Sequence, residues 1–210
     1  MSNAIAIGRL TLPEILDTQS LRLADDPHFF EEWQGVQPPL TAEDSHFLDQ
    51  VQNDYVDQLR QGQLSEGLIK LVIISPLLHL AGFYRHPYQV RLEEPVQVEV
   101  TEGSVTWRGR IDALVVQNKL WVVVVESKGG AFGIDQAIPQ ALGYMFAAPD
   151  LQCPVYGLVT NGSSYAFLKL VRQPEALYSV SDVWLLLPGR PILHRVLGVL
   201  RAIAQSPNFG

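Results

Sequence analysis

The sequence has one cysteine, no long hydrophobic run and no excess of positive charge, and each of these narrows what the protein can be. Cys153 cannot form a disulfide within the chain, which favours a reducing compartment and a fold held by its core. No run approaches the roughly 20 apolar residues of a membrane-spanning helix, and no basic stretch followed by an apolar one suggests a signal peptide. We therefore expect a cytoplasmic protein with no membrane partner.

The shortage of positive charge is confined to the N-terminal third of the chain. Residues 1–66 hold 12 acidic and 3 basic side chains, a balance of −9, whereas residues 67–210 hold 10 acidic and 12 basic, a balance of +2. The net charge of −7 would by itself disfavour a nucleic-acid partner, because polyanions are bound through Lys and Arg. The local balance removes that objection for the larger part of the chain.

Hydrophobic periodicity predicts an α/β fold. Residues 42–60 repeat apolar side chains at helical spacing after Thr41 and Asp44, a pattern typical of a helix start. A second helix is predicted from Ser65 to Gly82, with Pro76 expected to bend or shorten it. The other predicted elements are a strand over 88–100, a hairpin of 105–116 and 120–125, a helix over 134–148, a hairpin of 155–159 and 165–170 around Asn161-Gly162, and a helix over 190–204.

The first hairpin carries the residues that point to chemistry. Glu126, Ser127 and Lys128 follow six consecutive apolar residues, and charged groups in such a place are costly to bury without partners. If the loop spans five residues, 117–121, then Asp112 lies directly opposite Glu126, and both share a face with Lys128. A two-residue turn would shift this register by one and separate the two carboxylates.

Two adjacent carboxylates and an ammonium group form a set suited to phosphodiester chemistry. Carboxylates held side by side repel each other, which invites a shared proton or a hard cation such as Mg²⁺, with Mn²⁺ as a substitute. A metal held by Asp112 and Glu126 could stabilise the charge that develops on a phosphodiester under attack. Lys128 would then orient the attacking water or help to deprotonate it.

The spacing of these residues resembles the PD-(D/E)XK nuclease superfamily, and most of all the nuclease domain of type I restriction-enzyme motor subunits. Gly109-Arg110-Ile111-Asp112 precedes Glu126-Ser127-Lys128 by thirteen residues, with Ile111 in the place of the motif's proline. The similarity covers roughly residues 60–172. It also includes a glutamate on the preceding helix, Glu66, and the hairpin over 159–168. On the following helix it includes a Gln-x-x-x-Tyr pattern, Gln140 and Tyr144, with one more glutamine, Gln136.

The resemblance implies a restriction endonuclease-like α-β-β-β-α-β core, with a mixed central sheet flanked by helices. It also implies that Asp112, Glu126 and the Ser127 carbonyl bind Mg²⁺, that Lys128 serves catalysis, and that the substrate is nucleic acid, most readily DNA, in restriction, defence or repair. Glu66 would add a direct or indirect metal contact, and Gln140 and Gln136 would position the scissile strand. We expect an acidic helical extension over 1–60, the nuclease-like core over 61–172, and a C-terminal extension of the same domain over 173–210.

Each of these interpretations has a simpler alternative. Gln136, Gln140 and Tyr144 also fit one polar face of a helix. Arg108 and Arg110, beside Trp107, would contact phosphates or a stacked base, or else form a solvated rim. The whole chain would also fit a catalytically silent nuclease fold that binds a partner or forms an oligomer, with residues 1–66 covering the site. A metal between the two carboxylates favours the enzyme, whereas a Lys128–Glu126 ion pair favours the silent fold.

Overall fold

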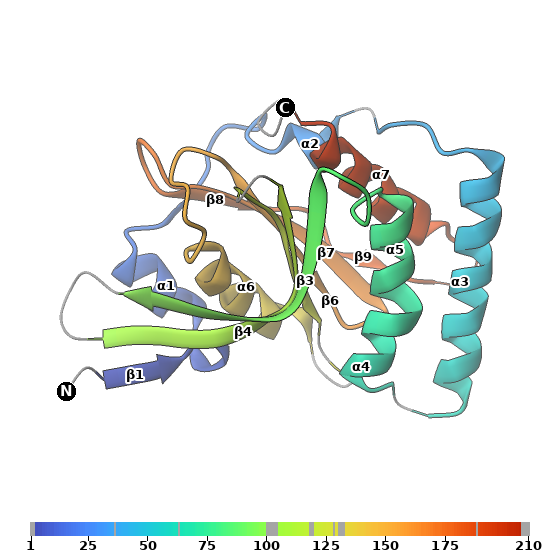
Figure 1. Cartoon of the computed structure of the whole chain (residues 1–210), viewed down its shortest axis with the longest axis horizontal. Coiled ribbons are helices and arrows are strands. Elements are labelled where there is room, and N and C mark those ends of the chain that lie inside the picture. Colours follow the sequence, from blue (N-terminus) through green and yellow to red (C-terminus); the bar gives the residue numbers. More distant parts are fainter. Residues whose placement is uncertain are drawn as a thin grey trace.

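The computed structural model describes residues 3–35, 37–62, 64–99, 105–117, 120–127, 129, 133–187 and 189–206. It is a mixed α/β structure (Figure 1). Its elements in chain order are β1 (Asn3–Ala6), η1 (Ile7–Arg9), α1 (Leu12–Thr18), β2 (Arg22–Leu23), α2 (Glu31–Gln34), α3 (Ala42–Arg60), α4 (Glu66–Ile69), η2 (Lys70–Ile74), α5 (Ser75–Leu80), β3 (Tyr88–Glu99), β4 (Val105–Gln117), β5 (Leu120–Ser127), η3 (Ile134–Gln136), α6 (Ala137–Met145), β6 (Val155–Thr160), β7 (Ser164–Val171), β8 (Leu177–Val180), β9 (Trp184–Leu185) and α7 (Ile192–Ala204).

The described strands form one mixed sheet in the order β1-β4-β5-β6-β7-β8-β2, with β3 added to β4 and β9 to β7. Hairpin neighbours β3–β4, β4–β5 and β6–β7 are antiparallel, whereas β5 and β6 are parallel because α6 carries the chain back between them. The sheet is therefore mixed, as the sequence predicts.

Helices cover both faces of the sheet (Figure 1), and each face has its own apolar cluster. The larger cluster joins α3, α5 and α7 to the sheet through Tyr156 and Phe167. The other joins α1 and α6 to it through Leu114 and Leu168. Because neighbouring residues of a strand point to opposite faces, the unbroken buried runs of β6 and β4 supply both clusters at once.

The helix predicted over 42–60 is confirmed, and its first turn is tied to the last helix. Thr41 and Asp44 form the expected capping box, in which the Asp44 N–H donates to Thr41 Oγ1 at 3.0 Å and the Thr41 N–H to Asp44 Oδ2 at 2.9 Å. Arg201 of α7 adds two hydrogen bonds of 2.8 Å to the same carboxylate. These hydrogen bonds, above all the pair from Arg201, hold the pKa of Asp44 at about 2, below its ordinary 3.8.

The Asp44–Arg201 pair predicts a loss of stability in acid. A carboxyl whose folded-state pKa is depressed stabilises the fold above its unfolded pKa, and that contribution disappears as the pH falls from about 4 toward 2. The pair is largely buried, so we expect a loss of about 2 kcal/mol over this window. Urea unfolding at several pH values should show this dependence in the wild type and in the exposed-site control Asp57→Asn, but not in Asp44→Asn. Equal pH dependence in all three would contradict it.

The second predicted helix runs from α4 through η2 to α5, and Ser65 caps it as expected through a 3.3 Å hydrogen bond from the Leu68 N–H. Pro76 neither breaks nor ends it. Instead the turn before it, Lys70–Ile74, is π-helical, which widens the helix where proline has no N–H to donate. Lys70 therefore stands at the start of an irregular turn that faces the sheet.

The β4–β5 hairpin corrects the predicted five-residue loop. The strands continue to the pair Gln117–Leu120, so only residues 118 and 119 separate them. The register nevertheless shifts by one between Val115 and Val116, because β5 carries an extra residue there. Beyond this bulge the pairing is Ala113–Val125, and one step further in the same register brings Asp112 opposite Glu126. The bulge thus restores the predicted alignment that a short turn would have removed.

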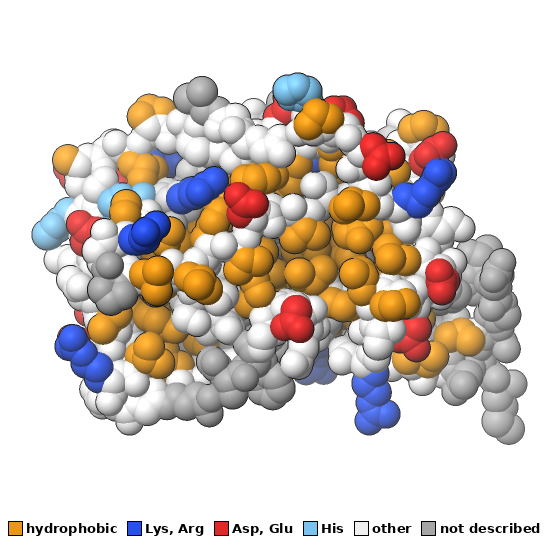
Figure 2. Space-filling view, turned by 180° about the vertical axis from the view of Figure 1, so that it is seen from behind, with side chains coloured by type: hydrophobic (Ala, Val, Ile, Leu, Met, Phe, Trp, Pro, Cys, Tyr) orange, Lys and Arg blue, Asp and Glu red, His pale blue; other side chains and the backbone are white. Residues whose placement is uncertain are grey.

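The N-terminal segment contributes strands as well as helices. β1 pairs parallel with the start of β4, and β2 pairs parallel with β8 at the opposite end of the sheet. Figure 2 shows the face opposite to that of Figure 1, where hydrophobic side chains gather over the middle and Lys and Arg stand singly around the margin. No helix among the described residues is long and apolar enough to cross a membrane.

Candidate active site

The candidate site lies where β4 changes partners. One edge of β4 pairs with β3 along nearly its whole length. Its other edge pairs with β1 through residues 105–108 and with β5 through residues 113–117. Residues 109–112, the first half of the nuclease-like motif, lie between these two partners. Within this interval the Arg110 N–H donates to a side chain of α6 and not to a neighbouring strand.

Tyr144 of α6 contacts this interval. Its hydroxyl accepts hydrogen bonds from the Arg110 N–H at 3.3 Å and from Gln140 Nε2 at 2.8 Å. Burial raises the pKa of Tyr144 to about 12, and the negative charge of Glu126, followed by that of Asp112, adds to the increase. The Gln-x-x-x-Tyr pattern thus reaches the motif strand, with the tyrosine next to both predicted metal ligands.

Gly109 is required for this approach. A methyl group on its Cα would lie 2.6 Å from Cε1 of Tyr144 and 3.2 Å from Cβ of Ile7. We expect Gly109→Ala to destabilise the fold by about 1–3 kcal/mol, because both neighbours are packed and cannot move aside freely. Gly67→Ala is the matched control, since a methyl group there meets nothing within 4 Å. Thermal unfolding compares the two variants, and a Gly109→Ala protein as stable as the wild type would contradict this reading.

Asp112 and Glu126 are both buried, with 6% and 2% of their surface exposed. Glu126 lies one residue beyond Val125, the last β5 residue paired with β4, and its partner in the parallel β5–β6 ladder is Val159. The negative charges of both carboxylates contribute to the raised pKa of the Tyr144 hydroxyl. Buried carboxylates are costly unless a cation or hydrogen bonds compensate them.

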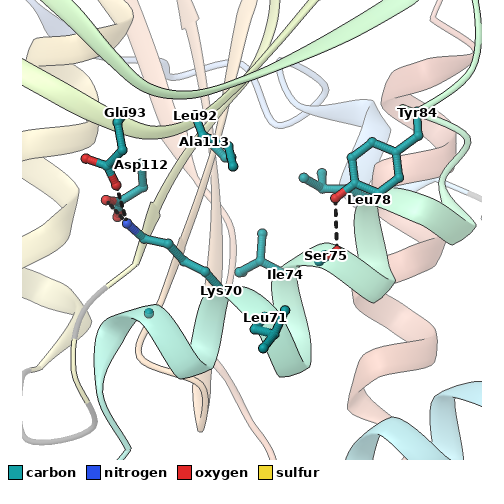
Figure 3. A pocket seen from close by; sticks show the side chains of 11 residues that line it. Lys70, Leu71, Ile74, Ser75, Leu78, Tyr84, Leu92, Glu93, Asp112 and Ala113 are labelled. Atoms are coloured by element: carbon teal, nitrogen blue, oxygen red, sulfur yellow. Dashed lines mark hydrogen bonds and ion pairs between the residues drawn. The ribbon is translucent and has the colours of Figure 1, made fainter.

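Lys70 supplies a cation to this cluster (Figure 3). Its Nζ lies 2.7 Å from Asp112 Oδ1, 2.9 Å from Glu93 Oε1 and 3.3 Å from Glu66 Oε1. Burial alone would lower the pKa of Lys70, but the hydrogen bonds that Lys70 donates to Asp112 and Glu93 raise it above its usual range. We call these residues, together with Glu126, the carboxylate cluster: Glu66, Lys70, Glu93, Asp112 and Glu126.

The carboxylate cluster is crowded with negative charge. Burial raises the pKa of Glu66, and the nearby Asp112 carboxylate raises it further, against the lowering effect of Lys70. Three carboxyl groups, those of Glu66, Glu93 and Asp112, thus share the Lys70 ammonium group. A second cation or a shared proton would relieve the excess.

The donor chemistry of the cluster fits Mg²⁺ or Mn²⁺. Its carboxylate oxygens are hard ligands, and they already hold one cation, the Lys70 ammonium, at distances of 2.7 to 3.3 Å. Among the described residues, no group of three or more His, Cys, Asp and Glu side chains is arranged to hold a metal ion. Mg²⁺ does not need one, since it is commonly held by one or two carboxylates and completed by waters and substrate phosphate.

The structure places the other predicted site residues as follows. Ser127 continues β5 beside Thr160, so its carbonyl is part of the strand end. Lys128, the predicted catalytic lysine, lies outside the described residues. Gln136 is exposed on η3, before α6, and the structure gives it no hydrogen bond to the described part of the cluster. Arg108 and Arg110 are exposed on β4 and remain candidates for phosphate contact.

Two features differ from the sequence interpretation. Trp107 is only 2% exposed and belongs to the apolar cluster beneath α6, so it cannot stack on a base as a rim residue would. Lys70 and Glu93 belong to the site but were not expected there. The spacing of Glu66 and Lys70, four residues apart on one helix, was a usable signal for Lys70. For Glu93 the signal was absent, since its place depends on how β3 pairs with β4.

Comparison of the chain with known proteins identifies no family and a weak structural similarity. No protein-family model and no curated protein matches the chain. A solved structure of a fragment of a putative HsdR subunit of a type I restriction enzyme from Vibrio vulnificus YJ016 resembles it with a TM-score of 0.41 and 20% sequence identity. The match covers 65% of this chain and 26% of that one.

Proposed function

We propose that this protein is a Mg²⁺-dependent nuclease that hydrolyses DNA phosphodiester bonds at the carboxylate cluster. The observation that carries the proposal is that Asp112 and Glu126 are both buried and that each follows or precedes a member of the Ala113–Val125 pair of the β4–β5 hairpin by one residue. The strand motif and the helix residues Glu66, Gln140 and Tyr144 match the restriction endonuclease-like pattern read from the sequence. The fold is the mixed α/β arrangement that such a core requires.

In this proposal each residue of the chain has a defined task. Asp112, Glu126 and the Ser127 carbonyl hold Mg²⁺, which when bound offsets charge on the attacked phosphate. Glu66 shares the Lys70 ammonium group with Asp112 and would support that carboxylate or accept a proton from the attacking water. Lys70 and Lys128 provide positive charge near the phosphate, and Gln140 with Tyr144 fixes the backbone of the motif strand.

The alternative is a silent nuclease fold that only binds its partner. The specific observation in its favour is the 2.7 Å ion pair between Lys70 and Asp112, because a lysine in that place already compensates a metal-ligand carboxylate. The two alternatives differ in metal binding. The enzyme must release Lys70 from Asp112 when Mg²⁺ enters, whereas the silent protein keeps the ion pair.

The test is cleavage of labelled single-stranded and duplex DNA by the wild-type chain in Mg²⁺, Mn²⁺ or EDTA, run beside calorimetric titration of Mn²⁺. The nuclease is expected to cut DNA in either metal, to stop in EDTA and to bind Mn²⁺ at a single class of site. Metal binding without cutting would overturn hydrolysis by this chain alone. Neither binding nor cutting would leave the silent fold as the explanation.

A further inference from the structure

An apolar pocket of about 280 Å³ adjoins the carboxylate cluster. One wall is the irregular helix over 66–80, and the other is formed by β3 and β4 (Figure 3). Asp112 and Lys70 lie at one end of it, and Tyr84 lies at the other, with its hydroxyl donating to Ser75 Oγ at 3.1 Å. The reacting phosphate and whatever fills the pocket would therefore be immediate neighbours.

The lining of this pocket is apolar and exposed to solvent. Leu71 and Leu92 are each 68% exposed, and Tyr84 is 48% exposed. Large apolar side chains in contact with water at a concave surface indicate a ligand that covers them. The volume falls just below the roughly 300–1,000 Å³ of ordinary small-molecule sites, so the pocket suits a single flat ring system better than a helix or strand of a protein partner.

We propose that this pocket receives one unstacked base of a single-stranded nucleic acid, next to the phosphate bound at the carboxylate cluster. The inference rests on the proposed function, because it takes the cluster as the place of the phosphate. Tyr84 provides an aromatic surface, Leu71 and Leu92 cover the base, and Asp112 joins the pocket to the metal ligands. A base within a duplex is stacked and paired and cannot enter, so the pocket makes an unpaired or flipped strand the preferred substrate.

The acidic side chains at one end of the pocket make the binding of a nucleotide depend on a metal ion. Glu93 and Asp112 would repel the phosphate of the incoming nucleotide unless a divalent cation offsets them. Binding is therefore expected to need a metal ion, and Ca²⁺ is a suitable probe because it also takes carboxylate and phosphate oxygens.

Two matched pairs of variants separate the pocket from the fold. Tyr84→Ala removes the aromatic surface, whereas Tyr84→Phe keeps it and loses only the hydrogen bond to Ser75. Gly67→Phe places a ring into the pocket from its helical wall, whereas Gly67→Ala adds a methyl group where nothing lies within 4 Å. Circular dichroism and thermal unfolding serve to check that each of the four variants folds.

The experiment measures binding of the full chain, in Ca²⁺ and in EDTA, to a labelled oligothymidylate of about 12 nucleotides, to an abasic strand of equal length and to the matching duplex. The wild type is expected to bind oligothymidylate roughly 5- to 100-fold more tightly than the abasic strand, and only in Ca²⁺. This preference should persist in Tyr84→Phe and Gly67→Ala, and should vanish in Tyr84→Ala and Gly67→Phe.

Three results would overturn the base pocket. The first is that the wild type binds the oligothymidylate and the abasic strand with equal affinity, or binds neither. The second is a base preference that survives both Tyr84→Ala and Gly67→Phe. The third is self-association of the wild type that only Gly67→Phe abolishes, which would assign the pocket to a second copy of the chain. The cleavage assay gives a separate answer. Cutting without base preference refutes the pocket alone, whereas base preference without cutting refutes hydrolysis alone.

Discussion

Asp112→Asn and Glu126→Gln are each expected to reduce metal-dependent DNA cleavage on the order of 1000-fold, the largest effect on activity predicted for any single change. Each change keeps the shape of the side chain and removes the charge that holds the metal. Both residues are buried and aligned on adjacent strands, so neither can replace the other. The measurement is the single-turnover rate with labelled DNA in Mg²⁺.

A control variant and a double variant test whether the loss of cleavage comes from these two carboxylates acting together. Glu175→Gln removes a carboxylate of an exposed ion pair with Arg22, and it should cut at the wild-type rate. The double variant Asp112→Asn with Glu126→Gln should be no slower than the slower single variant, because residues that act as one unit do not contribute additively. Full activity in either single variant would place the metal elsewhere.

Long elements with strong periodicity were predictable from the sequence. The helix over Ala42–Arg60 follows from its apolar spacing and from the Thr41 cap, and the β6–β7 hairpin follows from Asn161-Gly162, whose glycine has a φ of +86°. In both cases the decisive contacts are local, so a short window of sequence contains them.

Features that depend on distant pairing were not predictable. β1 has four residues and β2 has two, too few for a periodic signal, and both are held by parallel partners far along the chain. The bulge in the β4–β5 hairpin leaves no mark in a run of identical valines, so the loop was predicted too long. The predicted loop is wrong, but the Ala113–Val125 pair has the register on which the predicted alignment of Asp112 with Glu126 was based.

The candidate site likewise contains residues that the sequence identified and residues that it did not. Asp112 and Glu126 were identified from residue type and spacing, and Gln140 and Tyr144 from the resemblance to the nuclease superfamily. The structure joins Gln140 to Tyr144 and Tyr144 to Arg110 of the motif strand. Lys70 was passed over because its partner is a carboxylate on a strand more than forty residues away, and that contact arises only when the π-helical turn faces β4. The sequence thus indicated the two carboxylates of the candidate site but not the lysine that pairs with one of them.

Glu32→Ala is expected to cost about 3–5 kcal/mol of folding stability, the largest destabilisation predicted here, without touching the carboxylate cluster. Glu32 of α2 accepts hydrogen bonds from Lys169 Nζ at 2.9 and 3.0 Å and from the Tyr156 hydroxyl at 2.5 Å. The side chains of Lys169 and Glu32 are only 12% and 13% exposed. Removing the carboxylate leaves an ammonium group buried among aromatic rings with no charge to balance it.

A second substitution distinguishes the cost of an unpaired charge from the loss of packing. Lys169→Met in the Glu32→Ala background removes the stranded ammonium group but keeps an unbranched apolar side chain between the rings, so it should recover at least about half of the lost stability. Guanidinium unfolding measures all three proteins, with the single Lys169→Met variant completing the cycle. A double variant no more stable than Glu32→Ala would assign the loss to packing. Because this pair lies in the core shared by α2, β6 and β7, the surviving folded fraction should still cut DNA, which separates stability from catalysis.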